Sequence, residues 1–418
     1  MKYDVVIAGA GPAGIAAALE AARSGAKTAL IERYGCVGGN LTLGYVGPLL
    51  GSVCPGTIAE EIEDAICLKR GMVPDFERAK IALTAMLDKE GIDVYLQTVV
   101  TGAEKDGETL KKVFTSGKFG KIEFTADVFI DATGDGDLAV QSGCPFEIGR
   151  EEDGLVQPVT LMFVIEGVDP AQPLLCCHEE HYTNLGDGRE YLDLCHKACR
   201  SGELPENVNI VRLYATERKT ERMVNATQEN YIDPLDPASV FRAETSLRRQ
   251  IGKILDFLRN NIPGFADIRI KGSASTLGVR ESRRIIGQYV LTKEDLLAGR
   301  TYPDSVVHQA HFCLDIHNPA GPGQSEHDEK RPSSPIPYDI PFSAMCPLGC
   351  GNLITAGRCI SGTHVAHSSY RVMRICMAMG QAAGAAAAIM SQSGKTTGTL
   401  NVQDVRSHLI KRGVQLEG

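Results

Sequence analysis

The spacing of apolar residues in the first part of the chain changes from strand-like to helix-like and back. Residues 3–8 form a nearly continuous apolar run, which is typical of a strand buried on both faces of a parallel sheet. Residues 15–23 are rich in Ala at helical spacing, and Gly25 ends this segment. Residues 27–31 return to a short apolar run. This order predicts a strand, a helix and a second, parallel strand.

The same two patterns continue over the rest of the chain. We predict further helices, the first with Thr57 as its N-cap, at residues 58–69, 77–90, 238–260 and 369–390. We predict further strands at residues 92–100, 112–114, 121–124, 127–130, 159–165 and 352–358, the last of which enters a glycine turn. Residues 318–337 are rich in Pro, Gly, Ser and charge, which indicates a surface loop.

The last predicted helix is rich in Ala and Gly, so we expect something large to pack very close to it. Its most apolar run, residues 376–390, is interrupted by Gly380, Gln381 and Gly384. We expect this run to be too short to cross a bilayer and to form a buried helix instead.

These elements predict an α/β fold with two domains. The character of the sequence changes near Gly143. We expect residues 1–150 and 340–418 to form one discontinuous, Rossmann-like domain, and residues 151–339 to form an inserted substrate domain of mixed α+β structure. The 418 residues, 43% of them apolar and 23% charged, have the composition of an ordinary soluble protein with two or three domains' worth of core.

A glycine motif connects the first strand to the first helix. Gly9, Gly11 and Gly14 have the spacing G-x-G-x-x-G. In such a motif the first Gly permits a tight turn, the second lets the backbone approach a pyrophosphate, and the third lets helix pack on strand. The free N–H groups of the helix N-terminus attract the anion. Glu32 ends the second strand, where its carboxylate can accept hydrogen bonds from ribose hydroxyls, so we expect a bound dinucleotide.

Three further features favour FAD over NAD as that dinucleotide. The pair Gly38-Gly39 lets the loop after Arg33 lie against the rest of a long cofactor. Residues 131–134, Asp-Ala-Thr-Gly, end a distant strand and offer a second close approach of the backbone. The turn at Gly357 precedes a helix whose N-terminus can stabilise electron-rich flavin oxygens.

Together these motifs resemble the FAD-dependent oxidoreductase family of glutathione-reductase-like flavoproteins, some members of which are labelled xanthan-lyase-related. The segments that carry the resemblance span almost the whole chain and are residues 38–42, 131–137, 277–285 and 352–362. The resemblance implies FAD and a two-domain fold, but no particular substrate. The residues expected at the cofactor are Gly9, Gly11, Pro12, Ala13, Gly14, Glu32, Arg33, Gly38, Gly39, Asn40, Thr42, Ala132, Thr133, Gly134, Asp135, Gly357 and Arg358.

One position departs from the pattern of these flavoproteins. Many of them have Asp after the late Gly, to meet the ribityl chain or a phosphate, whereas this chain has Arg358. The Arg358 side chain could contact the pyrophosphate or leave the site.

Several redox and metal motifs are missing from the sequence. There is no second G-x-G-x-x-G and no C-x-x-C beside the cofactor loop, where Cys36 stands alone. The 13 cysteines are an odd number in a large chain, so we expect reduced thiols. The Cys- and His-rich stretch 176–199, including His178 and His181, could bind a metal, but buried thiols and surface histidines are the favoured interpretation and no metal is expected.

Three clusters offer groups for proton transfer and substrate binding. Arg280 and Arg283 could clamp a carboxylate, or could belong to a solvated strand face that Glu281 neutralises. Strand alternation would put these two arginines on opposite faces, so that only one of them enters the site. Asp315 and His317 would share one face of a strand, where the carboxylate fixes the tautomer of the imidazole, or would form a structural pair.

The third cluster follows the late glycine turn and should lie near the flavin ring. His364 and Tyr370 are possible acids or bases, and Arg371 could orient an anionic substrate or stabilise reduced flavin. The alternative for this segment is helix capping and contact with FAD.

We therefore expect an enzyme that transfers a hydride between flavin N5 and a small polar organic substrate, either a carboxylate or a sugar-like alcohol. Two alternatives remain at this point: a flavin-bearing electron-transfer subunit that docks a redox partner, and an NAD-dependent dehydrogenase.

Net charge bears on the expected binding partners, and the N-terminal segment bears on the expected location in the cell. The formal net charge of −9 opposes nonspecific binding to nucleic acid or to an anionic membrane. No signal peptide precedes the first strand, so we expect a cytoplasmic protein. We expect a small-molecule substrate and an external electron donor or acceptor, with the oligomeric state open.

Overall fold

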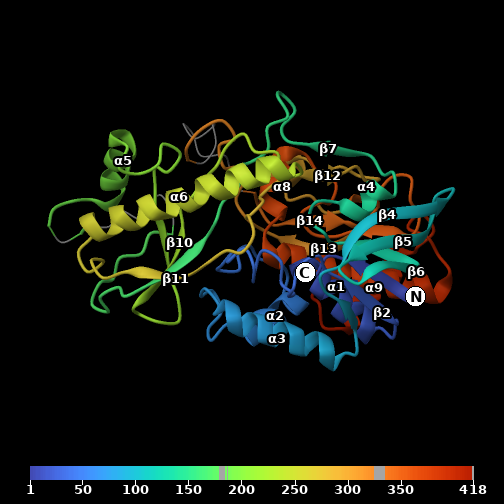
Figure 1. Ribbon diagram of the computed structural model, residues 1–418. Coiled ribbons are helices and arrows are strands. Elements are labelled where there is room, and N and C mark those ends of the chain that lie inside the picture. Colours follow the sequence, from blue (N-terminus) through green and yellow to red (C-terminus); the bar gives the residue numbers. More distant parts are fainter. Residues whose placement is uncertain (178–183, 186, 324–334, 417–418) are drawn as a thin grey trace.

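The computed structural model describes residues 1–177, 184–185, 187–323 and 335–416 (Figure 1). Its largest sheet has a parallel part with the strand order β3-β2-β1-β6-β15. The strands of this part are β1 (Lys2–Ala8), β2 (Thr28–Ile31), β3 (Asp93–Tyr95), β6 (Gly120–Asp131) and β15 (Leu353–Thr355). Antiparallel strands β4 (Val99–Asp106) and β5 (Thr109–Gly117) extend the sheet along the first half of β6. This is the parallel-rich α/β fold that the apolar runs predict.

The register of the parallel strands brings their carboxyl ends to one edge. Ala8 pairs with Ile31 on one side and with Asp131 on the other, and Thr355 pairs with Asp131. The segments that leave these four strands are therefore neighbours in space, although they are far apart in the sequence. Ligands of open α/β sheets bind in the crevice at this edge.

Helices α1 (Pro12–Arg23) and α9 (Met373–Ser393) pack very closely on this sheet. A Cβ added to Gly380 would lie 2.0 Å from the carbonyl oxygen of Ala13, and one added to Gly384 would lie 2.3 Å from that of Ala17. The element expected beside the Ala- and Gly-rich helix is therefore α1, seen beside α9 in Figure 1.

The Ala- and Gly-rich helix differs in extent from the helix predicted from the sequence. The segment predicted as one helix over residues 369–390 is divided between α8 (His364–Tyr370) and α9. The run 376–390 lies within the longer helix α9, whose 21 residues are long and apolar enough to cross a membrane by length and composition, but the run forms a buried helix as expected. In this fold 89% of the most apolar window of α9 is buried within the protein.

Two further helices pack with α1 and α9 in one hydrophobic core beside the parallel strands, called the first core below. These are α2 (Ile58–Ile66) and α3 (Phe76–Lys89), and α10 (Val402–Lys411) follows α9 at the end of the chain. Thr57 precedes α2 as predicted, but its hydroxyl makes no capping hydrogen bond to any residue that the structure describes. Gln381 Oε1 of α9 instead accepts the hydrogen bond from Ile58 N, at 2.9 Å.

A second, antiparallel sheet has its own hydrophobic core. Its order is β11-β8-β10-β9, and the long helix α6 lies across it in Figure 1. The elements around this core are β8 (Phe163–Glu166), α5 (Tyr191–Ser201), β9 (Arg212–Ala215), β10 (Glu221–Asn225), α6 (Pro237–Asn261) and β11 (Arg269–Ser273). Its buried side chains come from residues 159–277, whereas those of residues 291–340 pack in the first core. The inserted domain of residues 151–339 thus remains a prediction, and the packing associates its last part with the first core.

The remaining elements are short. They are α4 (Asp137–Gln141), β7 (Phe146–Ile148), β12 (Arg283–Ile285), α7 (Lys293–Leu297), β13 (Ser305–Ala310), β14 (Tyr338–Pro341) and a 3₁₀ turn (Phe342–Met345). Strand β7 pairs with β12, and β13 pairs with β14. The central part of the predicted loop 318–337, residues 324–334, lies outside the described residues.

Candidate functional site

A cavity of about 370 Å³ lies at the carboxyl edge of the parallel strands. Its walls come from the segments after β1, β2, β6 and β15, from the start of β4, and from residues of the second core such as Val240 and Leu277. Most of the residues predicted at the cofactor line it: Gly9, Gly11, Pro12, Ala13, Glu32, Arg33, Gly39, Asn40, Ala132, Thr133, Gly134, Asp135, Gly357 and Arg358.

The three fingerprint glycines occupy three different environments. Gly9 has a φ of +93° and lies against the backbone of Ala132, which is the tight turn expected of it. Gly11 has open space where a Cβ would lie, with no atom within 4 Å. A Cβ on Gly14 would lie 1.8 Å from the carbonyl oxygen of Gly9, so this position serves the packing of α1 on β1. The open space at Gly11 belongs to the cavity.

Gly38 and Thr42, both predicted at the cofactor, do not line the cavity in the described structure but hold the loop beside it. Gly38, at a φ of +108°, donates through its N–H to Ala10 O at 2.7 Å. Thr42 Oγ1 donates to Val37 O at 2.6 Å. These contacts hold the loop so that Gly39 and Asn40 line the cavity.

Glu32 is buried at the end of β2 and is held by the backbone. Its two carboxylate oxygens accept hydrogen bonds from Ala10 N and Tyr34 N, each at 2.8 Å. Burial raises the pKa of Glu32. Each oxygen keeps a lone pair after its one hydrogen bond, so the carboxylate can still accept a bond from a ligand hydroxyl.

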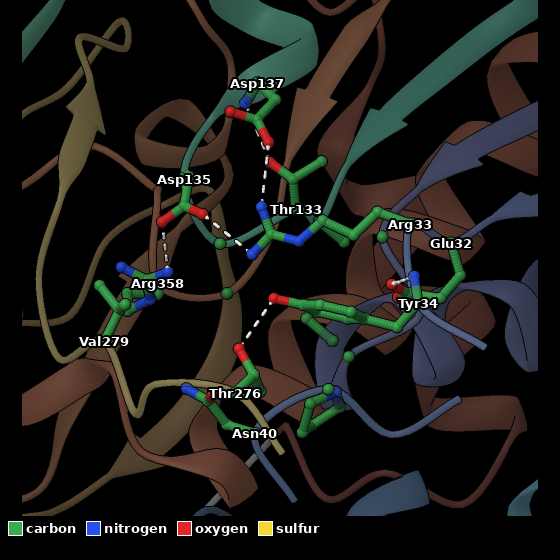
Figure 2. A pocket seen from close by; sticks show the side chains of 18 of the residues that line it. Glu32, Arg33, Tyr34, Asn40, Thr133, Asp135, Asp137, Thr276, Val279 and Arg358 are labelled. Atoms are coloured by element: carbon green, nitrogen blue, oxygen red, sulfur yellow. Dashed lines mark hydrogen bonds and ion pairs between the residues drawn. The ribbon is translucent and has the colours of Figure 1, made fainter. Parts of the chain in front are cut away.

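Asp135 joins three side chains from separate parts of the chain. Figure 2 shows two of them, Arg33 and Arg358, directed at its carboxylate. Its carboxylate lies 2.6 Å from Arg358 Nη2 and 3.3 Å from Arg33 Nη2, and it accepts a hydrogen bond from Ser282 Oγ at 2.7 Å. Burial favours the neutral carboxyl, but the charges of Arg358 and Arg33 outweigh it and lower the pKa of Asp135. Of the two orientations considered for Arg358, the side chain thus does not leave the site: it lines the cavity and is directed at Asp135.

Some lining residues escaped sequence reasoning. Tyr34 follows Arg33 directly, and its hydroxyl lies 2.9 Å from Thr276 Oγ1 on the opposite wall (Figure 2). Val99 and Val100 line the cavity from the start of β4. Tyr34 could have been found from its place beside Glu32, but no local motif marks Thr276 or the valines, because tertiary contacts bring them together.

Arg371 is bonded to the Asp315–His317 pair. Arg371 lines the cavity, and its Nη2 donates to Asp315 Oδ2 at 2.9 Å. His317 Nε2 lies 3.6 Å from the same oxygen. The pair does not stand on a strand as predicted, because residues 312–316 form no ladder, but the two side chains still meet. Burial and the charge of Arg280 lower the pKa of His317 to about 3, so its imidazole is neutral at pH 7.

The two arginines of the predicted clamp have different partners. Arg280 is buried and donates to Pro158 O at 2.6 Å, and burial lowers its pKa to about 9. Arg283 forms an ion pair with Asp137 at 3.0 Å and donates to Asp135 O, on the cofactor side. The guanidiniums are thus directed at separate groups and do not form one clamp.

His364 and Tyr370 lie in a buried layer among the described residues. His364 Nδ1 lies 2.8 Å from Glu281 Oε1, which also forms a short ion pair with Arg284. Tyr370 is fully buried, its hydroxyl donates to Ile360 O at 3.2 Å, and burial raises its pKa well above 10. Neither side chain is part of the cavity wall in the described structure.

No group of three or more His, Cys, Asp or Glu side chains that could hold a metal occurs in the described parts of the chain. His178 and His181 lie outside those parts. In the described parts of the chain the 13 cysteines, including Cys176, Cys177, Cys195 and Cys199 of the same stretch, form no disulfide.

Comparison with solved structures supports the fold. A geranylgeranyl bacteriochlorophyll reductase-like protein from Thermoplasma acidophilum aligns with 99% of this chain and 84% of its own, with a TM-score of 0.50 and 14% identity. At this identity the likeness concerns the fold alone. A flavoprotein/dehydrogenase from Cytophaga hutchinsonii also aligns, over 98% of this chain and 83% of its own, with a TM-score of 0.47 and 14% identity.

Two relatives match in sequence over part of the chain. An uncharacterized protein in the nifH2 5' region of Methanosarcina barkeri is 28% identical over 182 residues, which are 37% of this chain and 95% of the relative. The tRNA uridine 5-carboxymethylaminomethyl modification enzyme MnmG of Campylobacter hominis is 40% identical over 80 residues, which are 18% of this chain and 11% of that enzyme. The match thus spans about a tenth of that enzyme's length.

The family profile described as FAD dependent oxidoreductase matches residues 4–409. This match includes the fingerprint, the segment of Asp135 and the turn at Gly357, which together line the cavity. The chain therefore belongs to the FAD dependent oxidoreductase family, and it is an enzyme that uses FAD.

Proposed function

We propose that FAD lies along the described cavity and that the enzyme transfers a hydride between the flavin and a small polar organic molecule, either a carboxylate or a sugar-like alcohol. One observation carries this proposal: the same cavity is lined by Gly11 and Glu32 and by Arg371, which is bonded to the pair of half-buried Asp315 and buried His317. The proposal includes a glutathione-reductase-like FAD domain and a cytoplasmic enzyme with an external electron donor or acceptor.

The residues of the cavity fit the cofactor. The first turn of α1 has no side-chain cap, so its N–H groups are free to bind a pyrophosphate in the open space at Gly11. The first turn of α9 has no side-chain cap either, and Met373 and Cys376 of this helix line the cavity. We assign the pyrophosphate to α1, the ribose to Glu32, and the electron-rich oxygens of the flavin ring to the N-terminus of α9.

When bound, the flavin supplies two-electron hydride chemistry. The work of the protein is then to bind the substrate and to move a proton. Arg371 offers a guanidinium for an anionic or hydroxyl-bearing substrate. His317, as a neutral imidazole beside Arg371, accepts the proton that leaves the substrate during its oxidation. Its lowered pKa makes it a weak base, so it passes this proton on rather than keeping it. Asp315, at 3.6 Å, stabilises the imidazolium that results.

Two alternative functions, an NAD-dependent dehydrogenase and an electron-transfer subunit, are disfavoured on different grounds. The family assignment favours FAD over the NAD-dependent dehydrogenase. An electron-transfer subunit needs a flavin edge that a partner protein can reach and needs no proton acceptor. The buried His317 and half-buried Asp315 beside a cavity-lining arginine favour a substrate site over a docking surface.

Rapid mixing without oxygen tests the proposal. The FAD-loaded enzyme is mixed with a panel of short hydroxy acids, amino acids and sugar alcohols while the flavin absorbance near 450 nm is followed. We expect saturable bleaching with at least one of them. An enzyme that no panel member reduces, but that a one-electron protein partner reduces rapidly, would establish the electron-transfer alternative.

A further inference from the structure

Two buried hydrogen-bond donors, one on the cavity-lining Arg371 and one on its neighbour Gln157, lack partners among the described residues. The side-chain nitrogen of Gln157, a residue with no exposed surface, makes no hydrogen bond to any described residue. The same holds for the buried Nε of Arg371, within the described part of the chain. Unpaired buried donors are unfavourable and rare, and in a native fold they indicate a missing partner, such as a ligand or an ordered water.

The orientation of the Gln157 amide is fixed by its neighbours. Gln157 Oε1 accepts hydrogen bonds from His317 N at 3.2 Å and from Arg371 Nη2 at 3.5 Å. Both of these groups are donors, so a flipped amide would set its NH₂ against two other N–H groups. The unpaired group is therefore the NH₂ donor, and it calls for an acceptor.

Gln157 connects the groups proposed for proton transfer. Its side chain contacts His317 and Arg371, as described above, and its backbone N donates to Glu281 Oε2 at 3.1 Å. Glu281 in turn contacts His364. On the other side of Gln157, Arg371 lines the cavity. An acceptor that reached Gln157 from the cavity would thus lie beside Arg371 and His317.

We propose that Gln157 Nε2 and Arg371 Nε bind a carboxylate oxygen of the substrate. This inference rests on the proposed function and deepens it, because it selects the carboxylate from the two substrate classes. A carboxylate only accepts hydrogen bonds, and it pairs with a guanidinium more strongly than a neutral oxygen does. A sugar-like alcohol could accept from the two donors, but it would not complement the positive charge that remains where Arg371 and Arg280 share the single carboxylate of Asp315. Gln157 is on this account a substrate-binding residue that no motif marks.

The test is carboxylate binding to the oxidised, FAD-loaded enzyme, followed by the difference spectrum of the flavin. Acetate, lactate and benzoate are titrated, with acetamide, lactamide and benzamide as neutral analogues and chloride as the salt control. We expect a saturable spectral change with a carboxylate and none with its amide. Gln157→Leu should raise the dissociation constant about 10- to 100-fold, because it removes a hydrogen bond to a charged group. Gln157→Glu, which replaces the donor by a second carboxylate, should abolish binding.

A control variant at an exposed glutamine shows whether the effect is specific to Gln157. Gln403→Leu, on an exposed position of α10, should leave the dissociation constant unchanged. If Gln157→Leu does not fold, Gln157→Asn, which withdraws the donor by one methylene, should give the same direction of change. Carboxylate binding that is unchanged in the folded Gln157 variant, or absent from the wild type, would overturn the inference. A loss of FAD affinity without a loss of carboxylate affinity would also overturn it, since the acceptor would then be the cofactor. Carboxylate binding that needs Gln157 supports the inference even if no compound reduces the flavin, a result that would count against the hydride-transfer proposal alone.

Discussion

Asp135 and Arg358, 223 residues apart in the sequence, form an ion pair of 2.6 Å at the cavity. Asp135 follows β6 and Arg358 follows β15, and the two strands pair in parallel up to Asp131 and Thr355. Arg33 reaches Asp135 from the far side at 3.3 Å. An acid between two guanidiniums thus connects three of the segments that line the cavity.

Removing Arg358 should destabilise the protein at neutral pH. Arg358→Met leaves Asp135 buried with a weaker set of partners, and breaking a buried pair costs about 3–5 kcal/mol of unfolding free energy. The pKa of Asp135 is lowered in the fold, so this stabilisation is present above the unfolded pKa of about 4 and is lost as the pH falls through the lower, folded value.

Urea denaturation of wild type and variant at pH 7 and at pH 3 measures both effects. The difference between the two proteins should shrink at the lower pH. The double variant Asp135→Asn/Arg358→Met should be more stable than the sum of the single changes implies. Additive single changes would mean that the pair does not interact.

Substitution of two fingerprint glycines by valine should have different effects, one on cofactor binding and the other on folding. A side chain at Gly11 meets open space and an ordinary φ of −73°, so Gly11→Val should fold and yet obstruct the cofactor. A side chain at Gly14 meets the Gly9 carbonyl oxygen at 1.8 Å, so Gly14→Val should prevent folding. Circular dichroism and flavin absorbance of the purified proteins distinguish the two. A yellow Gly11→Val protein would contradict the placement of the pyrophosphate.

The contact between α1 and α9 gives a prediction on stability. Gly384→Ala places a Cβ 2.3 Å from Ala17 O and should lower the midpoint of thermal unfolding. Gly252→Ala is the matched control, since this exposed glycine of α6 has no atom within 4 Å of the added Cβ. It should stabilise the protein by about 0.5–1 kcal/mol through helix propensity. Stabilisation by both changes would show that the helices can separate at no cost.

His317 should act as a base without the usual titration of a histidine. Its pKa is lowered to about 3, so the neutral form needed to accept a proton persists well below pH 6. With a reducing substrate, the acid limb of the rate of flavin reduction should therefore be flat through pH 6.5, where an unperturbed histidine would lose activity. His317→Ala should slow flavin reduction about 10²- to 10⁴-fold, whereas His196→Ala on an exposed position of α5 should not. A rate that falls with an apparent pKa near 6.5 would assign the proton to another group.

Local patterns in the sequence predicted the parts of the fold that local physics decides. The fingerprint after β1 and Glu32 after β2 are a short-range motif, and the structure places both at one edge of a parallel sheet. The Ala- and Gly-rich helix implied a close neighbour because small side chains permit one, and α1 is that neighbour.

The rest of the site depends on contacts between distant segments. Tyr34 and Thr276 meet across the cavity although 242 residues separate them. The partners of Arg280 and Arg283 diverge because the backbone between them turns toward different neighbours, Pro158 and Asp137. Asp315 and His317 pair without the strand that spacing suggested, because Arg371 and Gln157 hold them.

The central claim is that one cavity holds the cofactor and directs its reactive ring to Arg371 and the Asp315–His317 pair. A crystal structure of the FAD-loaded enzyme tests this claim most directly. The account predicts the pyrophosphate at Gly11, the ribose at Glu32, and the flavin ring against Arg371 and Met373 at the start of α9. A flavin ring that lies away from Arg371, or an adenosine bound elsewhere than Glu32, would contradict it.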